Sequence, residues 1–485
     1  MDRCGFAGMM MMGLCLALGA LPVIGLPAVA TAATVRHAQQ ISSDTLPDAV
    51  AGEQDTQGEP SIALDPRDPN RVVSVFQARR YKDGGSAAIG YATSHDGGAT
   101  WVRGILPGLT RASGGAFPRA SNPTVAFGPD GTVYAESLLV TPSRRDCVPA
   151  SRTAVAVQRS TDGGLTFGAP VLVQDDRAAC HGHGALNDKP WLAVDTGSGP
   201  HRGRLYLVWT LLPGTLVERH SDDNGIHWSA LQNIPFPGEA TGAVTLVGPD
   251  GNLTIVFNND VPHSDPVAYA ISSPDGAASW GRPRQIAHLR AGGPYGIRLG
   301  PPGGFPAAAV DSTDGAIYVA WRDDRFRRNR YPHFYSDIVI SGSRDGGSTW
   351  SPPRRVNTRA QTSTVQSFMP AVAAYGGDVS VSYLAAREGS WLAQPLLSVS
   401  HDGGATFGGA VRLGPLLNLR YAARTCFGCG TRYAEWNSFL GDYMGIAAGP
   451  GVAHPIWPRP SRRGTADYHQ TTWSATVGWI QAPGL

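Results

Sequence analysis

The chain has 485 residues, of which 42% are hydrophobic and 16% charged, and its formal net charge is +2 at pH 7. Glycine (61) and proline (38) are frequent and no long helical periodicity occurs, which favours an all-β protein rich in turns. The balanced charge and the lack of a basic stripe with interleaved aromatics argue against nucleic-acid binding.

The first 32 residues are typical of a secretory signal peptide. Arg3 precedes an apolar run over 4–30, and the small residues of Ala30-Thr31-Ala32 offer a cleavage site. An uncleaved membrane anchor is the alternative, although Pro22 and Pro27 break the apolar run. We predict a signal peptide over 1–32, one folded domain over 33–485, and a secreted or periplasmic location.

Six octets of the pattern Ser-x-Asp-Gly-Gly-x-Thr-Trp recur at spacings of about 50–70 residues, which indicates a repeat architecture. They lie at 94–101, 160–167, 221–228, 272–280, 343–350 and 400–407. The Asp is expected to accept hydrogen bonds from its own turn, the glycines to supply positive φ, and the closing aromatic to pack between adjacent sheets. Calcium binding is disfavoured because each octet offers a single carboxylate.

These octets resemble the Asp-box, or bacterial neuraminidase repeat, of the sialidase superfamily, whose members are β-propellers. The resemblance spans about residues 59–480. It implies an all-β fold made of a single β-propeller with four-stranded antiparallel blades.

Each octet is preceded by a short apolar strand that we expect to be the innermost strand of a blade. The clearest examples are 60–65, 123–128, 190–195, 306–311 and 370–375, with a variant at 242–257 and a unit without an octet at 441–480. Seven units favour seven blades, with six blades and a C-terminal extension as the alternative. The last unit lacks one strand, and 34–42 is predicted to pair with 472–479 and close the ring.

Antiparallel order places the octets on one face, and the second-to-third loops and blade-to-blade links on the other. The long insertions fall on this second face, at 111–122, 175–189, 290–305, 322–335 and 416–442. Because variable loops on a rigid scaffold usually carry the site, we expect functional residues there.

The resemblance implies a retaining mechanism in which a Tyr attacks, a Glu assists it and an Asp serves as acid/base. Tyr443, in the run DYMGI, matches the nucleophile, and Asp83 is placed like the acid/base. The family's Glu has no counterpart: Gly242 occupies its expected position, so Asp442 or Glu59 would have to accept the proton of Tyr443. An ordinary strand-entry aromatic at Tyr443 and an ordinary turn at Asp83 are the alternatives.

Sialidases also hold the substrate carboxylate with three arginines. The first stands in a Phe-Arg-Ile-Pro motif, but the matching tetrad here, 57–60, reads Gln-Gly-Glu-Pro and lacks it. The remaining substrate-binding candidates are Arg298, Arg322, Arg325, Asn122, Asp188 and Lys189. The last three, together with Glu59 and Asp442, are expected to ring the central channel. Surface ion pairs of the arginines with Asp323 and Asp324, and a water-filled plug in the channel, are the alternatives.

Removal of the signal peptide leaves four cysteines, and an even number in an exported chain favours disulfides. We predict that Cys147 pairs with Cys180, and Cys426 with Cys429. A metal site formed by the CxxC of the second pair with Cys180, His181 or His183 is the alternative, and a thioredoxin-like role lacks its βαβ context. We expect no metal and no cofactor.

The favoured function is a secreted, sialidase-like exo-glycosidase acting on terminal sugars of glycans. A non-catalytic propeller that binds glycan or protein is the main alternative. An Asp-box xyloglucan hydrolase is disfavoured because that family pairs two propellers in a longer chain.

Overall fold

The computed structural model describes residues 33–143, 150–177, 186–259, 266–290, 297–298, 304–328, 335–358, 360, 362–427, 435–462 and 468–479. Within these ranges, only the backbone is described at 150, 297–298, 426–427 and 435–437. The helices there are two short 3-10 turns, η1 (Arg111–Ser113) and η2 (Leu419–Tyr421). Among the described residues, no helix has the length and apolar character that a membrane span requires.

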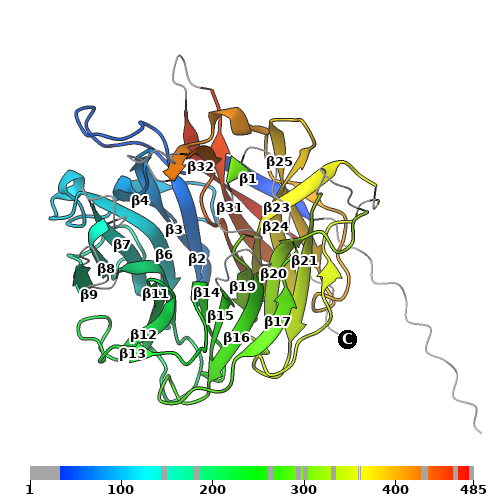
Figure 1. Cartoon of the computed structure of the whole chain (residues 1–485), viewed down its shortest axis with the longest axis horizontal. Helices are drawn as coiled ribbons and strands as arrows, with labels where there is room; N and C mark the ends of the chain where they lie inside the picture. Colours follow the sequence, from blue (N-terminus) through cyan, green and yellow to red (C-terminus); the bar gives the residue numbers. More distant parts are fainter. Residues whose placement is uncertain are drawn as a thin grey trace, which may run out of the picture.

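Four-stranded antiparallel sheets follow one another along the chain, and Figure 1 shows them fanned around a common centre. The first eight strands after β1 form two such units: β2 (Gly58–Asp65), β3 (Asp68–Arg80), β4 (Ser86–Ser94) and β5 (Val102–Ile105), then β6 (Arg119–Phe127), β7 (Val133–Pro142), β8 (Ala150–Ser160) and β9 (Val171–Arg177). A single bridge between Ser86 and Ala120 joins these two units into one sheet.

The next three sheets each have four strands in sequence order. They comprise β10 (Asn187–Val194), β11 (Leu205–Leu211), β12 (Thr215–Ser221) and β13 (Gln232–Asn233); β14 (Ala240–Val247), β15 (Leu253–Asn259), β16 (Val267–Ser273) and β17 (Arg284–His288); and β19 (Ala307–Val310), β20 (Ile317–Asp323), β21 (Asp337–Ser343) and β22 (Arg354–Arg355).

The remaining strands form three sheets. They comprise β23 (Val365–Tyr375), β24 (Asp378–Arg387), β25 (Leu392–Ser400) and β26 (Val411–Arg412), with β27 (Leu417–Asn418) paired to β25; β30 (Gly445–Gly449), β31 (Val452–Pro460), β32 (Gln470–Gly478) and β1 (Thr34–Gln40); and β18 (Ile297–Arg298), β29 (Glu435–Phe439) and β28 (Arg424–Phe427). The last sheet, which the sequence did not predict, joins two links that are far apart in the chain.

The first strands of the four-stranded units pack against one another in a closed cycle. β2 contacts β6, followed by β10, β14, β19, β23 and β30, and β30 contacts β2 again. Apolar side chains fill the space between neighbouring sheets, as Trp101 does between β2–β5 and the sheet of β30 and β31. This arrangement is consistent with a β-propeller.

The N-terminal strand completes the last sheet, as the sequence predicted. β1 pairs antiparallel with β32, with Val35 opposite Val477 and Gln40 opposite Trp473, and blue β1 lies beside the red strands in Figure 1. The following segment continues the pairing, because the Ile41 amide donates to the Thr472 carbonyl at 2.9 Å. The first and last parts of the described chain are therefore held in one sheet.

The six octets form near-identical turns, named here the repeat turns. In the first, the Asp96 carboxylate accepts hydrogen bonds from the Thr100 amide (2.8 Å), the Thr100 hydroxyl (2.6 Å) and the Ser94 hydroxyl (2.8 Å). Gly97 and Gly98 have φ of 68° and 88°, which an L side chain rarely adopts. The Gly97 carbonyl accepts from Thr476 of β32 at 2.7 Å, so the turn also fastens two sheets together.

The repeat turns lie at the same end of the sheets as the turns that follow the first strands. The Gly97 amide donates to the Asn70 carbonyl at 2.9 Å, and the Gly403 amide donates to Gly377 at 3.0 Å. The first strands therefore enter at the opposite end, where the sequence places the candidate site.

Candidate binding cavity at the head of the first strands

Residues at the entry of the first strands share an unusual backbone conformation. Glu59, Asn122, Lys189, Gly242 and Met369 have φ of 50°, 47°, 52°, 68° and 51°. Each lies at a break in the register with the second strand of its sheet. Such bulges re-aim side chains and are frequent beside functional sites. The repetition of this strained conformation builds one ring of entry residues from five of the four-stranded units.

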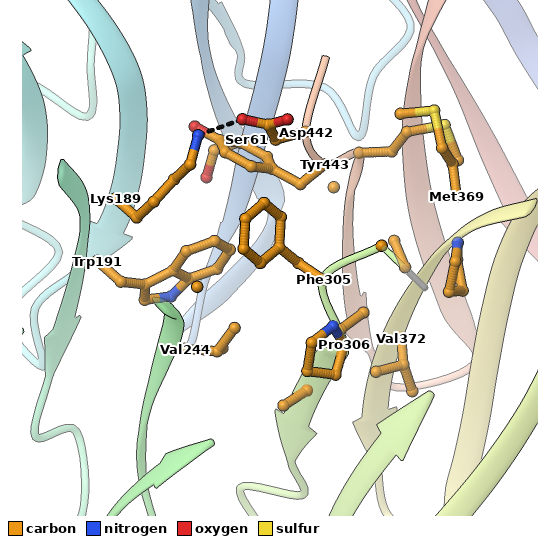
Figure 2. A pocket seen from close by; sticks show the side chains of 18 of the residues that line it. Ser61, Lys189, Trp191, Val244, Phe305, Pro306, Met369, Val372, Asp442 and Tyr443 are labelled. Carbon is orange, nitrogen blue, oxygen red and sulfur yellow. Dashed lines mark hydrogen bonds and ion pairs between the residues drawn. The ribbon is translucent and has the colours of Figure 1, made fainter. Parts of the chain in front are cut away.

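A cavity of about 130 Å³ lies at this level of the ring. Its wall takes residues from the entry of every first strand in the cycle, and Figure 2 shows the interior. The residues used below are Ser61, Asn122, Lys189, Trp191, Gly242, Phe305, Arg322, Asp442 and Tyr443. Among the described residues, the wall therefore combines three aromatic side chains with two cations and one carboxylate.

Phe305 projects into the cavity beside Trp191 and Tyr443 (Figure 2). Gly242 makes room for it, since a Cβ on Gly242 would lie 1.9 Å from Cδ1 of Phe305. Sequence reasoning missed this pair and Trp191. The sequence did contain a clue: Gly242 stands at an entry position where Glu59, Asn122 and Lys189 carry side chains, which indicates that another group occupies that space.

Lys189 and Asp442 form an ion pair within the cavity wall. The Lys189 ammonium also lies 5.5 Å from the ring centroid of Phe305. Burial alone would lower the pKa of Lys189, but the carboxylates of Asp442, Asp188 and Glu59 raise it above its ordinary value. Lys189 is therefore a permanent cation at neutral pH. The sequence predicted both residues at this channel.

Tyr443 lies against Trp191, with ring centroids 5.6 Å apart in an edge-to-face arrangement. Its hydroxyl donates to the Pro123 carbonyl at 3.0 Å. Burial, and then the negative charges of Glu59, Glu136 and Asp442, raise the pKa of Tyr443 well above its ordinary value. Among the described residues, no carboxylate accepts a hydrogen bond from this hydroxyl.

Glu59 is buried behind the wall rather than in it. One carboxylate oxygen accepts from Gln77 at 2.6 Å and from the Asn122 amide at 3.1 Å. Burial raises the pKa of Glu59 to about 7; Asp442 adds to this shift, whereas Lys189 and Arg80 oppose it. Burial likewise raises the pKa of Asp188. Both predicted carboxyls thus lie where their ionised forms are disfavoured.

Glu136, on β7, is a further buried carboxyl that sequence reasoning missed. Oε2 accepts from the Thr124 hydroxyl at 3.0 Å, whereas Oε1 has no partner among the described residues. Burial raises its pKa well above the ordinary value. The available signal was a glutamate in the middle of the apolar strand VYAESLLV.

Arg322 contributes to the wall and is 5% exposed. Its Nε and Nη1 atoms are buried and have no hydrogen-bond partner in the described part of the chain. Burial lowers the pKa of Arg322 to about 10. Nδ2 of Asn122, also in the wall, is a second buried donor that no described residue satisfies. Unsatisfied buried donors are costly, so these two groups mark a place for a polar ligand.

Arg325 and Arg298 do not join Arg322. Arg325 follows β20 and pairs at 2.7 Å with Asp323, the partner that the ion-pair alternative named, but this carboxylate is buried rather than at the surface. Arg298 belongs to β18, whose backbone pairs in parallel with β29, and its side chain lies outside the described residues.

Asp83 is exposed and is held by Arg119, whose Nη1 and Nη2 lie 2.7 and 3.1 Å from the two carboxylate oxygens. Asp83 is not among the described residues that line the cavity. Its role as acid/base, and that of Tyr443 as nucleophile, stay predictions.

The cysteine predictions fall outside the described residues. Cys147, Cys180 and Cys429, with His181 and His183, belong to undescribed segments, and only the backbone of Cys426 is described, in β28. In the described ranges, no group of three or more His, Cys, Asp or Glu side chains is arranged to hold a metal ion.

No family model matches the chain. A xyloglucanase from Paenibacillus sp is 26% identical over 310 residues, covering 61% of this chain and 26% of the relative. A probable oligoxyloglucan-reducing end-specific xyloglucanase from Neosartorya fischeri is 26% identical over 318 residues, covering 62% of this chain and 34% of the relative. The chain thus spans about a third or less of the length of these relatives, and its similarity to glycoside hydrolases is distant.

Solved structures with a similar fold include the Hadza microbial sialidase Hz136, at 14% identity and a TM-score of 0.45 over 84% of this chain and 74% of the other. A Trypanosoma rangeli sialidase has 14% identity, a TM-score of 0.44 and coverages of 73% and 57%. A Fusarium graminearum α-L-arabinofuranosidase has 13% identity and a TM-score of 0.44, and the match covers 72% of this chain and 92% of the other. Likenesses at this level do not extend to the activity of this chain.

Proposed function

We propose that this chain is a sialidase-like exo-glycosidase whose central cavity binds the acidic terminal sugar of a glycan. The observation that carries the proposal is Arg322, a buried guanidinium without a partner among the described residues, in the wall of a cavity lined by aromatic side chains. A carboxylate on the sugar would satisfy the guanidinium. Trp191, Tyr443 and Phe305 offer ring faces for the apolar side of a sugar.

The size of the cavity supports action on a chain end. Its volume of about 130 Å³ is small beside the roughly 300–1,000 Å³ of pockets that enclose drug-sized ligands. It suits one terminal unit rather than a run of sugars. Xyloglucan carries no charge, so an uncompensated guanidinium does not favour the substrate named for the sequence relatives.

For the chemistry we propose Tyr443 as nucleophile and Asp83 as acid/base. A phenol attacks only when a neighbouring base accepts its proton, and Glu59 and Asp442 are close enough to raise the pKa of Tyr443. Substrate binding would have to move the hydroxyl from the Pro123 carbonyl to one of these carboxylates. Asp83 would have to leave Arg119 and approach the bond that is cleaved.

The proposal includes the architecture. The closed cycle of seven first strands supports seven blades, with the repeat turns as Asp-boxes at the end opposite the site. We also propose that the mature protein is secreted or periplasmic and that its disulfides are those predicted from the sequence.

The test is fluorescence release from 4-methylumbelliferyl α-sialoside, β-glucuronide and β-glucoside by the exported protein. We expect release from the acidic substrates and none from the glucoside. Release from the neutral glucoside alone would refute recognition by Arg322, and no release from any substrate together with no binding of the free acids would refute the function.

The second candidate is a non-catalytic propeller that captures acidic glycans. Two observations favour it: the Tyr443 hydroxyl is engaged by a carbonyl, and Asp83 is engaged by Arg119. Binding of free sialic or glucuronic acid without turnover of either acidic substrate would select this candidate.

A further inference from the structure

The ion pair between Lys189 and Asp442 links sheets that are not neighbours. Lys189 lies on β10, which packs beside β6 and β14, whereas Asp442 immediately precedes β30, which packs beside β2 and β23. The pair therefore reaches across the ring, and Figure 2 shows it next to Ser61 and Tyr443. Any ligand in the cavity lies near this pair.

The charges of the wall do not balance. Lys189 is compensated by Asp442, whereas Arg322 has no partner in the described chain. Two further carboxyls face Lys189, those of Asp188 and Glu59, and burial raises the pKa of both; Arg80 in turn faces Glu59. Among the described residues, the wall thus presents one positive charge without an ion-pair partner, that of Arg322.

We propose that Asp442 sets the charge of the ligand that the cavity accepts. By occupying the Lys189 ammonium, its carboxylate leaves the guanidinium of Arg322 as the one cation without an ion-pair partner among the described residues of the wall. A ligand with one negative charge then neutralises the wall. A ligand with two meets an internal carboxylate already in place, and like charges in a desolvated site exclude it.

This role predicts opposite effects for the two partners of one ion pair. Asp442→Asn frees Lys189, so dianions should gain affinity. Lys189→Met leaves Asp442 uncompensated, so anions of either charge should lose affinity. A pair that serves only structure would behave differently, because both variants would lose stability and neither would gain affinity.

The experiment measures binding by calorimetry and thermal shift at low salt, where charge effects are largest. The probes are D-glucose, which is neutral, D-glucuronate, which carries one negative charge, and inorganic sulfate, which carries two. We expect Asp442→Asn to bind sulfate at least about tenfold more tightly than the wild type, and Lys189→Met to bind both anions at least about tenfold more weakly. Asp175→Asn is the matched control, since it removes one carboxylate from an exposed pair with Arg152 and should change neither affinity.

The choice of a sugar as ligand rests on the proposed function, whereas the charge rule does not. The experiment can therefore refute either one without the other. If glucuronate does not bind to the wild type but sulfate responds to the variants as expected, the acidic-sugar proposal fails and the charge rule stands. If folded Asp442→Asn gains no affinity for sulfate, the charge rule is wrong whichever sugar binds.

A double variant, Lys189→Met with Asp442→Asn, decides the matter should Asp442→Asn not fold. It differs from Lys189→Met only in lacking the carboxylate of Asp442, so it should bind sulfate at least about tenfold more tightly than Lys189→Met does. Equal affinity of these two variants for sulfate would overturn the inference.

Discussion

Carboxyl groups have opposite surroundings in the repeat turns and behind the cavity wall. In the turns, hydrogen bonds from Thr100 and its counterparts lower the pKa of Asp96 and Asp345 to about 2. Behind the cavity wall, burial raises the pKa of Glu59 to about 7. The turns surround each carboxylate with donors in contact with solvent, whereas Glu59 keeps donors from Gln77 and Asn122 but is shielded from solvent.

The contrast separates groups that maintain the fold from groups that await a ligand. A turn carboxylate is satisfied by residues at most four positions away, so it has nothing left to bind. Nε and Nη1 of Arg322 and the side-chain nitrogen Nδ2 of Asn122 are buried and unsatisfied by the described residues. Strained backbone at the strand entries accompanies these unsatisfied groups.

The largest effects come from one substitution made at two buried arginines. Arg327→Met removes a guanidinium bonded to Asp337 and to the carbonyls of Ala360, Ser363 and Val365. Because it leaves the buried carboxylate of Asp337 with only Asn357 and the more distant Arg355 as partners, it should cost about 3–5 kcal/mol in the free energy of unfolding.

Arg322→Met removes an unpaired charge, so Tm should stay level or rise while affinity for glucuronate falls at least about tenfold. Thermal unfolding and calorimetry on both variants check this. If Arg322→Met lowered Tm as much as Arg327→Met, Arg322 would be a structural residue like Arg327 and not a ligand-binding one.

The next effect is on catalysis. Tyr443→Phe deletes the attacking oxygen and, if the chain is a hydrolase, should lower kcat at least about a hundredfold. Affinity for the free acid should be kept, and stability should fall by only about 1 kcal/mol because a single hydrogen bond to Pro123 is lost. Steady-state kinetics with the acidic substrates measure this effect, and an unchanged kcat would exclude Tyr443 as nucleophile.

A smaller effect depends on pH. Since the pKa of Glu59 is raised to about 7, the folded state keeps a proton that the unfolded chain releases near pH 4.5, and stability falls as pH rises through this window. Glu59→Gln should therefore gain stability relative to the wild type between pH 5 and pH 8.

Asp96→Asn is the matched control, because its pKa is lowered to about 2 and its contribution disappears only below about pH 4. Urea titrations at pH 5 and pH 8 test both variants. If the free energies of unfolding of Glu59→Gln and the wild type differed by the same amount at pH 5 and pH 8, the raised pKa of Glu59 would be contradicted.

The smallest effect belongs to single repeat turns. Asp96→Ala and Asp345→Ala should each lower the free energy of unfolding by about 1 kcal/mol through lost turn hydrogen bonds. Neither should change binding or turnover, because the turns lie at the far end of the sheets from the cavity. A stable variant with impaired binding would break the contrast between the two regions.

Sequence patterns predicted what local interactions determine. The repeat turns and the first strands follow from hydrogen bonds and alternation within short segments, and the pairing of β1 with β32 was inferred from the strand that the last unit lacks. Asn122, Lys189 and Asp442 were placed at the channel because each enters a first strand, and they line the cavity.

Contacts between sheets could not be predicted in the same way. The fit of Phe305 beside Gly242 depends on how two adjacent sheets approach each other, and the pair of Lys189 with Asp442 depends on the diameter of the whole ring. The difference between Arg322 and Arg325 depends on which carboxylates each guanidinium can reach. Such features follow from ring geometry, which no short segment encodes.

The pairing of β1 with β32 also constrains when the molecule can be finished. Val35 pairs with Val477, so a growing chain has β1 long before it has β32. Until β32 has been synthesised, β1 remains an unpaired edge, open to other chains and to proteases. Ring closure therefore comes late and carries a loop-closure cost. A chain terminated before β32 could not close the ring in this way.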